Sequence, residues 1–186
     1  MLRLAYAQGY FPMPEPKTDE IFWYFPDPRA IIPLDGFRTT RSLMRSLRNR
    51  GYEITFDRAF HDVMKMCAAR SETWINDEFL RCYHLLHREG DAHSVEVWQE
   101  GRLVGGVYGV CLRGAFFGES MFHTERDASK VALYHLIERL RSKAFRLLEV
   151  QFMTEHLRSL GAIDIPGDAY KELLAQALQA PLSVRF

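Results

Sequence analysis

Two polar residues suited to acid–base chemistry, Glu149 and Gln151, lie two positions apart in the otherwise apolar run 147–152. We interpret this run as a strand, in which alternation places both side chains on the same face. A buried carboxylate or amide costs several kcal/mol of free energy unless it has a hydrogen-bond partner. The pair is therefore expected either to bond neighbouring backbone or to line a site where it handles a proton or orients a nucleophile.

A second acid, Glu119, lies in the apolar and aromatic segment 116–122, which we interpret as ending in a loop after residue 118. It is expected to be either an exposed loop acid or a group that binds a cation, an ammonium or a guanidinium. An apolar pocket beside a few convergent polar groups is typical of a substrate site. The stretch 105–151 thus predicts such a pocket with three polar groups.

The order of the surrounding elements predicts how these residues meet. Alternation and turn residues indicate antiparallel strands at 93–99, 103–112 and 115–118. A helix at about 127–143, with one apolar face, leads to a strand at 146–151. Because a helical crossover joins parallel strands, the last two strands should form a parallel pair in a mixed α/β sheet. Folds of this class commonly bind ligands at the carboxyl ends of parallel strands.

The other periodic segments predict further elements with local start and stop signals. They are strands at 21–25, 30–34 and 52–56, and helices up to Gly9 and at 41–49, 58–69, 77–88, 154–160 and 169–179. Asp57 and Asp168 are expected to cap the helices that follow them, and Asp127 or Ser129 the helix at 127–143.

An arginine stripe lies on the helix 41–49, which Thr40 can cap. Arg41, Arg45 and Arg48 share one side of this helix, at the spacing that brings side chains together. The stripe is either a solvated helix face or a patch that contacts the phosphates of a nucleic acid.

The composition limits the classes of function. The 186 residues include 24 basic and 24 acidic side chains, so no global positive field attracts nucleic acid and any such binding needs a local patch. No apolar run approaches the roughly 18 residues that cross a membrane, and no signal peptide is visible. The 3 cysteines form no C-x-x-C pair, which favours thiols in a reducing compartment. We expect a cytoplasmic protein.

Several common catalytic motifs are missing from the sequence. There is no phosphate-binding P-loop, no H-E-x-x-H zinc motif and no G-x-S-x-G nucleophile elbow. Gly105, Gly106 and Gly109 lie within the expected strand 103–112, where glycine indicates a bulge or a close backbone approach to a ligand.

Seven blocks of residues carry a family resemblance. They are Trp23-x-x-Pro26-Asp27-Pro28-Arg29, Thr73-Trp74-Ile75, Ala92-His93-Ser94-Val95-Glu96-Val97-Trp98, Leu103-Val104-Gly105-Gly106-Val107-Tyr108-Gly109, Phe117-Gly118-Glu119-Ser120-Met121-Phe122, Ala128-Ser129-Lys130 and His156-Leu157-x-Ser159-Leu160-Gly161-Ala162. In this order they closely resemble the leucyl/phenylalanyl-tRNA–protein transferases, from about Leu4 to about Tyr170.

The resemblance implies a fold and a reaction. The fold would be an α/β (α+β), GNAT-like (N-acetyltransferase-like) mixed sheet, with a small N-terminal subdomain at 1–57 and a catalytic domain at 58–186. The chain would move Leu or Phe, and also Met, from aminoacyl-tRNA to proteins with N-terminal Arg or Lys, which marks them for degradation. It would act as a monomer and need neither a cofactor nor a metal.

The resemblance also implies roles for individual residues. Gln151 would accept a hydrogen bond from the attacking amine, and Glu149 would orient and polarise that amine. Glu119 would hold the adenosine end or the substrate amine. The walls of the aminoacyl-adenosine site would come from Trp23, Trp74 and Phe116, and the side-chain pocket from Met121 and Val107.

Two other classes of function remain as alternatives. A divergent acyltransferase of the same fold would use another aminoacyl-tRNA or acyl-CoA. The run 123–128 has no glycine and two acids, which disfavours a pyrophosphate site for CoA. A tRNA-binding module without catalysis would need neither Glu149 nor Gln151.

Overall fold

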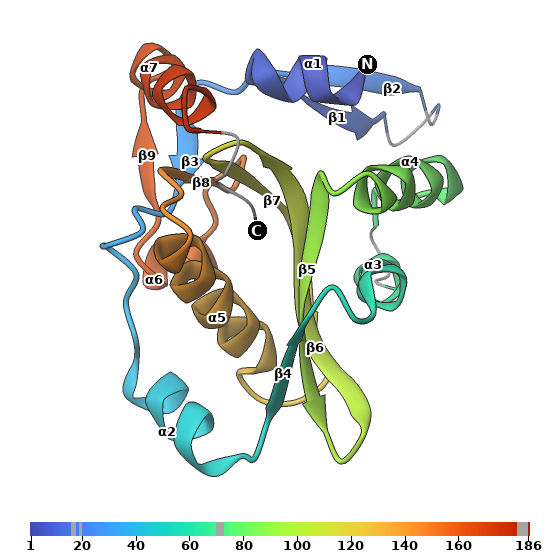
Figure 1. Ribbon diagram of the computed structural model, residues 1–186, viewed down its shortest axis with the longest axis vertical. Helices are drawn as coiled ribbons and strands as arrows, with labels where there is room; N and C mark the ends of the chain where they lie inside the picture. The colour runs from blue at the N-terminus through green and yellow to red at the C-terminus, as the bar shows by residue number, and fades with distance from the viewer. Residues whose placement is uncertain (16–17, 19, 70–72, 182–185) are drawn as a thin grey trace.

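A seven-stranded sheet forms the centre of the molecule (Figure 1). The computed structural model describes residues 1–15, 18, 20–69, 73–181 and 186. The sheet has the order β4-β5-β6-β7-β8-β3-β9, and β1 and β2 form a separate two-stranded sheet. The strands are β1 (Phe11–Pro14), β2 (Ile21–Tyr24), β3 (Arg29–Ile31), β4 (Glu53–Phe56), β5 (Ala92–Gln99), β6 (Arg102–Leu112), β7 (Ala115–His123), β8 (Leu147–Glu149) and β9 (Ile163–Ile165).

The pairing of β7 with β8 is parallel, with Ala115 opposite Leu147, whereas the other neighbouring strands of the large sheet are antiparallel. The predicted mixed sheet and its parallel crossover, the features expected of the N-acetyltransferase-like class, are therefore confirmed. A parallel connection needs a crossover element, and α5 provides it.

Helices cover both faces of the large sheet (Figure 1). They are α1 (Leu2–Ala7), α2 (Arg41–Asn49), α3 (Phe60–Ala68), α4 (Asp77–Arg88), α5 (Ala128–Ser142), α6 (Glu155–Ser159) and α7 (Gly167–Leu178). Helix α5 packs on β5, β6 and β7 from one side, and α3 packs on the same strands from the other. Two apolar cores result, one containing Leu136 of α5 and the other Val63 of α3.

Strand β7 runs five residues beyond the predicted end, because its pairing with β6 continues after a bulge. Tyr108 faces Ser120 and Gly109 faces Gly118, so Glu119 is the extra residue of the bulge. Glu119 therefore lies in a strand, and its placement in a loop was wrong. A β-bulge re-aims a side chain, and bulges are frequent beside active sites.

Two of the glycines in β6 permit close backbone contacts. A Cβ on Gly109 would lie 2.2 Å from the carbonyl oxygen of Phe117, at the bulge. A Cβ on Gly105 would lie 2.6 Å from the Cβ of Ala128, at the start of α5. The predicted bulge is confirmed, and the close approach at Gly105 is made by a helix of this chain.

Strand β8 ends at Glu149, two residues before the predicted end. Gln151 lies outside the strand with a left-handed backbone, at a φ of 61°. Strand alternation is therefore the wrong reason for bringing Glu149 and Gln151 together. The backbone turn after β8 does so instead.

Two of the three aspartates expected to cap helices lie at other positions. Helix α3 begins at Phe60, three residues after Asp57, whose carboxylate accepts a hydrogen bond from the Ser94 amide at 2.9 Å. Asp168 lies inside α7, after Pro166 at the cap position. Asp127 is the N-cap residue of α5, one of the two positions predicted, but it makes no side-chain capping hydrogen bond and its carboxylate instead accepts from Ser42. Thr40, in contrast, caps α2 as predicted.

Strands β1 and β9 were not predicted. Prolines interrupt the first, which tolerates them because it pairs only with β2. The second has three residues, too few for a periodic pattern.

Strands β3 and β4, which precede residue 58, both pair within the large sheet. The division into a subdomain at 1–57 and a catalytic domain at 58–186 stays a prediction. Within the described ranges, no helix has the length and apolar character that crossing a bilayer requires.

Candidate active site

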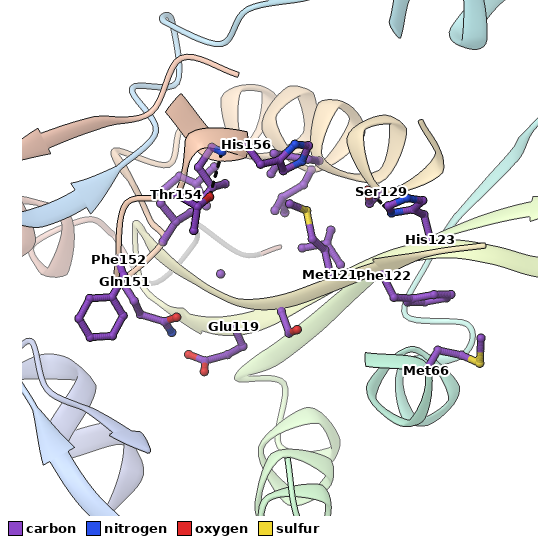
Figure 2. A pocket seen from close by; sticks show the side chains of 18 of the residues that line it. Met66, Glu119, Met121, Phe122, His123, Ser129, Gln151, Phe152, Thr154 and His156 are labelled. Carbon is purple, nitrogen blue, oxygen red and sulfur yellow. Dashed lines mark hydrogen bonds between the residues drawn. The ribbon is translucent and has the colours of Figure 1, made fainter. Parts of the chain in front are cut away.

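A cavity of about 730 Å³ opens between β7, α5 and the segment after β8 (Figure 2). Its wall is largely aliphatic, with contributions from Val107, Met121, Leu133, Leu136 and Leu148. Glu119 and Gln151 lie next to each other on the same wall (Figure 2). The arrangement has the usual form of a small-ligand site, apolar with a few convergent polar groups.

Glu119 is held by two tyrosines from distant parts of the chain. Its side chain is buried, the Tyr6 hydroxyl of α1 donates to one carboxylate oxygen at 2.7 Å, and the Tyr83 hydroxyl of α4 donates to the other at 3.1 Å. The two hydroxyls are 2.5 Å apart. The bulge thus points Glu119 at a prearranged pair of donors.

The protonation of Glu119 is balanced near neutral pH. Its pKa is raised to about 8 because burial penalises the charged form and the Glu149 charge adds to that penalty. Hydrogen bonds from Tyr6, Tyr83 and Gln151 offset part of the increase. Such a carboxyl group can gain or release a proton near neutral pH.

Glu149 is fully buried and lies behind the cavity wall. Its Oε1 atom accepts from Arg29 Nη1 at 2.8 Å and from the Gln151 backbone amide at 2.6 Å. Burial raises the pKa of Glu149, and the charge and hydrogen bond of Arg29 oppose that rise. The side chain therefore contacts Gln151 rather than the cavity.

The remaining predicted site residues divide into two groups. Trp74, Val107 and Met121 line the cavity with Glu119 and Gln151. Trp23 is partly exposed and lines a separate hollow beside α1. Its strand, β2, pairs with β1 and lies outside the large sheet. Phe116 is fully buried in the core under α5. Neither of these two residues lines the cavity that Trp74 lines, and their roles stay predictions.

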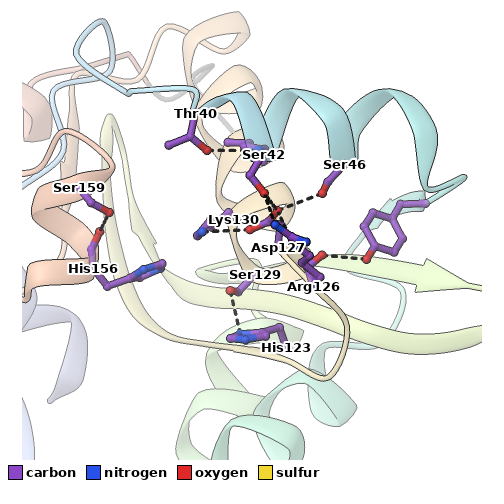
Figure 3. Close-up of polar contacts among 12 residues, drawn as sticks. Thr40, Ser42, Ser46, His123, Arg126, Asp127, Ser129, Lys130, His156 and Ser159 are labelled. Atoms are coloured by element: carbon purple, nitrogen blue, oxygen red, sulfur yellow. Dashed lines mark hydrogen bonds and ion pairs between the residues drawn. The ribbon is translucent and has the colours of Figure 1, made fainter.

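The arginine stripe lies away from the cavity. Arg41, Arg45 and Arg48 are exposed on α2, as predicted for one side of that helix. The other side of α2 contacts α5 through Ser42 and Ser46, which donate to Asp127 (Figure 3).

Two histidines lie at the opposite side of the cavity from Glu119 (Figures 2 and 3). His123 Nδ1 is 3.1 Å from the Ser129 hydroxyl. The pKa of His156 is lowered by burial and by the nearby positive charges of Lys130 and His123. This part of the wall is therefore polar and neutral to basic, in contrast to the acidic end.

One cluster of described side chains outside the cavity can hold a metal ion. It consists of Asp57, His87 and His93. Their polar atoms are used within the protein, since His93 Nδ1 lies 2.8 Å from Asp57 and His87 Nδ1 lies 2.8 Å from the Ala92 carbonyl oxygen. We interpret the cluster as a structural contact that links the turn between β4 and α3 to β5.

Sequence patterns did not predict Tyr6, Tyr83 or Arg29 as residues of the site. The tyrosines lie on amphipathic helices, where an aromatic residue predicts only core packing. For Arg29 there was a signal, since it adjoins the apolar run 30–34 just as Glu149 interrupts the run 147–152. Opposite charges in two apolar strands indicate a buried ion pair.

Comparisons with known proteins agree with the sequence blocks. Residues 31–175 match the family described as leucyl/phenylalanyl-tRNA protein transferase, and residues 1–27 match its N-terminal domain. The curated leucyl/phenylalanyl-tRNA–protein transferase of Herpetosiphon aurantiacus is 55% identical over 180 residues, 96% of this chain and 93% of that protein. The protein of that name from Ruegeria sp. is 53% identical over 182 residues, 97% of this chain and 87% of its own length.

A solved structure shares the fold. FemX aligns with 92% of this chain and 70% of its own, with a TM-score of 0.54 at 12% identity. That likeness shows a common architecture, whereas the relatives above show descent. The predicted resemblance is confirmed: the chain belongs to the leucyl/phenylalanyl-tRNA protein transferase family.

Proposed function

We propose that this chain is an aminoacyltransferase that moves leucine or phenylalanine from aminoacyl-tRNA to the N-terminus of a protein. The observation that carries the proposal is an aliphatic cavity with Glu119 and Gln151 on one wall, in a chain of this family. The cavity takes the donor's apolar side chain, and the polar wall takes the amine that attacks it.

The chemistry suits a site that aligns its reactants. The aminoacyl ester is already activated, so the acceptor amine forms a peptide bond as the ester C–O bond breaks. The proton that the amine loses ends on the released ribose hydroxyl. Because bond making needs a neutral, correctly aimed amine, positioning supplies much of the rate.

Gln151 and Glu149 have separate parts in this proposal. The Gln151 side chain on the cavity wall accepts a hydrogen bond from the attacking amine. Glu149 orients Gln151 through its backbone amide, since Glu149 itself lies behind the wall. An amide is a weak base, so Gln151 aims the amine rather than removing its proton.

Glu119 binds the substrate amine. An α-amino group has a pKa of about 7.7–8.0, close to the value of about 8 for Glu119. An ammonium beside Glu119 can therefore share its proton with the carboxylate at little cost. Tyr6 and Tyr83 keep the carboxylate in place during this exchange.

The aliphatic wall determines the donor. Val107, Met121 and Leu136 offer no hydrogen bond to a polar side chain, which disfavours donors such as Asp or Thr. An apolar pocket separates side chains of similar size poorly, so we include methionine as a further donor. Trp74 provides a surface on which the terminal adenosine can stack.

The acceptor and the cellular setting complete the proposal. The acceptor protein begins with Arg or Lys, and the added apolar residue marks it for degradation. The enzyme acts as a monomer in the cytoplasm.

A transfer assay tests the proposal. Purified protein is mixed with radiolabelled Leu-tRNA or Phe-tRNA and with matched substrates that begin with Arg, Lys or Asp. We expect label on the first two substrates and none on the third. Absence of transfer to every substrate, with intact tRNA binding, would instead indicate a binding module.

A further inference from the structure

Arg29 is a buried cation that no step of the reaction uses. It lies in β3 and is 1% exposed. Its guanidinium carbon lies 4.3 Å from the ring centre of Tyr170, 5.2 Å from that of Phe11 and 5.1 Å from that of Phe25. One nitrogen also donates to the Gly9 carbonyl oxygen. Segments from both ends of the chain therefore meet around one charge.

The charge of Arg29 is directed at Glu149. Arg29 Nη1 donates to Glu149 Oε1, and the same oxygen accepts the amide of Gln151. Gln151 has a left-handed backbone, which a non-glycine residue adopts only where its surroundings impose it. A continuous path of contacts thus runs from Arg29 through Glu149 to the cavity wall.

We propose that Arg29 is a positioning residue, which keeps the Glu149 carboxylate ionised and oriented so that Glu149 holds the Gln151 turn at the cavity. The inference rests on the proposed roles of Glu149 and Gln151. Arg29 does not touch the substrate, so it acts on the reaction only through these two residues.

The charges around Glu149 support this role. Arg29 faces Glu149 from β3, Glu119 faces it from β7 and Tyr170 from α7. Among these described groups, Arg29 is the one cation. Without it, burial and the neighbouring carboxyl group would both favour protonated Glu149, whose oxygen would be a weaker acceptor for the Gln151 amide.

A buried ion pair is also a weak source of stability. Replacing such a pair by apolar groups is often neutral or stabilising, because two charges must be removed from water. Packing alone therefore gives no reason for a guanidinium inside this aromatic cage, whereas control of the carboxylate does.

The test follows transfer as a function of pH. Single-turnover transfer is measured with wild type, Arg29→Met and Arg29→Lys between pH 6 and 9, and each rate is divided by that of wild type at the same pH. For every unit by which the Glu149 pKa rises above the assay pH, the ionised fraction falls about tenfold. We expect Arg29→Met to be at least about tenfold slower at pH 7 and to recover toward pH 9. Arg29→Lys, which keeps the charge, should restore part of the rate without a pH-dependent deficit.

Arg139→Met is the matched control, since Arg139 also stacks on aromatic rings, those of Phe56 and Phe186. Its ratio to wild type should not change with pH. A deficit of Arg29→Met that is equal at all pH values would overturn the inference and leave Arg29 a packing residue. If Arg29→Met does not fold, Arg29→Lys decides the question. Transfer by Arg29→Lys at the full wild-type rate would contradict positioning of Glu149 by Arg29. Failure of wild type to transfer at all would sink the proposed function instead.

Discussion

Two buried carboxylates near β7 are held in opposite ways. Asp127, just after the strand, accepts hydrogen bonds from Ser42 at 2.5 Å, Ser46 at 3.1 Å and Lys130 at 3.0 Å (Figure 3). Glu119, at the bulge within the strand, is bonded by tyrosine hydroxyls. Burial raises the pKa of both, but the donors of Asp127 outweigh it and lower that pKa to about 2. The pKa of Glu119 is raised to about 8.

The difference lies in the nearby charges. Lys130 compensates Asp127, whereas Glu119 shares its surroundings with Glu149. A carboxylate with a cation and several donors is permanently charged and fastens α2 to α5. A buried carboxylate beside another acid can change its protonation near neutral pH, which suits a group that takes part in acid–base chemistry. Burial alone does not distinguish the two uses.

The largest expected effect is on transfer when the acidic end of the cavity is altered. Gln151→Ala removes the acceptor proposed to aim the amine, and we expect single-turnover transfer to fall about 100-fold or more. Its side chain is only half-buried, so thermal unfolding should stay close to wild type. Asp127→Ala, which acts outside the cavity, serves as the control for activity. Equal loss of transfer in both variants would remove the distinction between the two regions.

The next effect is on stability at the Asp127 network. Asp127→Ala leaves three donors without their acceptor, and we expect the free energy of unfolding to fall by roughly 2 kcal/mol. Urea unfolding measures the loss, with the exposed Asp35→Ala as a control. A change within error of that control would show that the network does not fasten α2.

The two acids should also respond oppositely to pH. The pKa of Asp127 lies below its ordinary value of 3.8, so its contribution to stability is present above about pH 4 and lost as pH falls toward 2. The pKa of Glu119 lies above its ordinary value of 4.5, so stability is lost as pH rises from about 4.5 through 8.

Urea unfolding of wild type, Asp127→Asn and Glu119→Gln across this range measures both slopes. Wild type should gain on Asp127→Asn between pH 2 and about 4, and should lose to Glu119→Gln between about 4.5 and 8. Curves parallel to wild type for both variants would contradict the opposite shifts.

The smallest effect concerns the outer side of the helix that Asp127 fastens. Arg41→Glu with Arg45→Glu should weaken tRNA binding and lower the slope of log affinity against log salt by about 2, one for each lost phosphate contact. Lys171→Glu with Arg81→Glu, at other exposed positions, provides the control for charge alone. An unchanged slope would mean that the stripe is solvated.

Local patterns predicted most of the elements. Helix α2 has the predicted ends, because Thr40 caps it and its apolar spacing is clear. Helix α4 also has the predicted bounds. The errors occurred where distant partners decide: β7 continues past residue 118 because β6 lies beside it, and Asp57 bonds β5 instead of α3.

Distant partners also decide which of the candidate residues lie together. Glu119, Gln151, Trp74, Val107 and Met121 converge on one cavity; four of them lie in the sequence blocks, and Gln151 was singled out by its spacing from Glu149. Trp23 and Phe116 carried the same aromatic signal but lie elsewhere. The residue type predicts that an aromatic ring is packed in the protein. Only the pairing of the strands decides which residues surround that ring.

The sequence by itself determined the family and the mixed α/β class and indicated the candidate polar groups of the site, since these follow from local blocks and periodicity. Tertiary structure decided their ionisation and aim. The pKa of Glu119 is raised by burial and by the charge of Glu149, and the backbone amide of Gln151 donates to a carboxylate that also accepts from Arg29. Electrostatic energy depends on distance through space, and the chain separates these residues by tens of positions before folding brings them together.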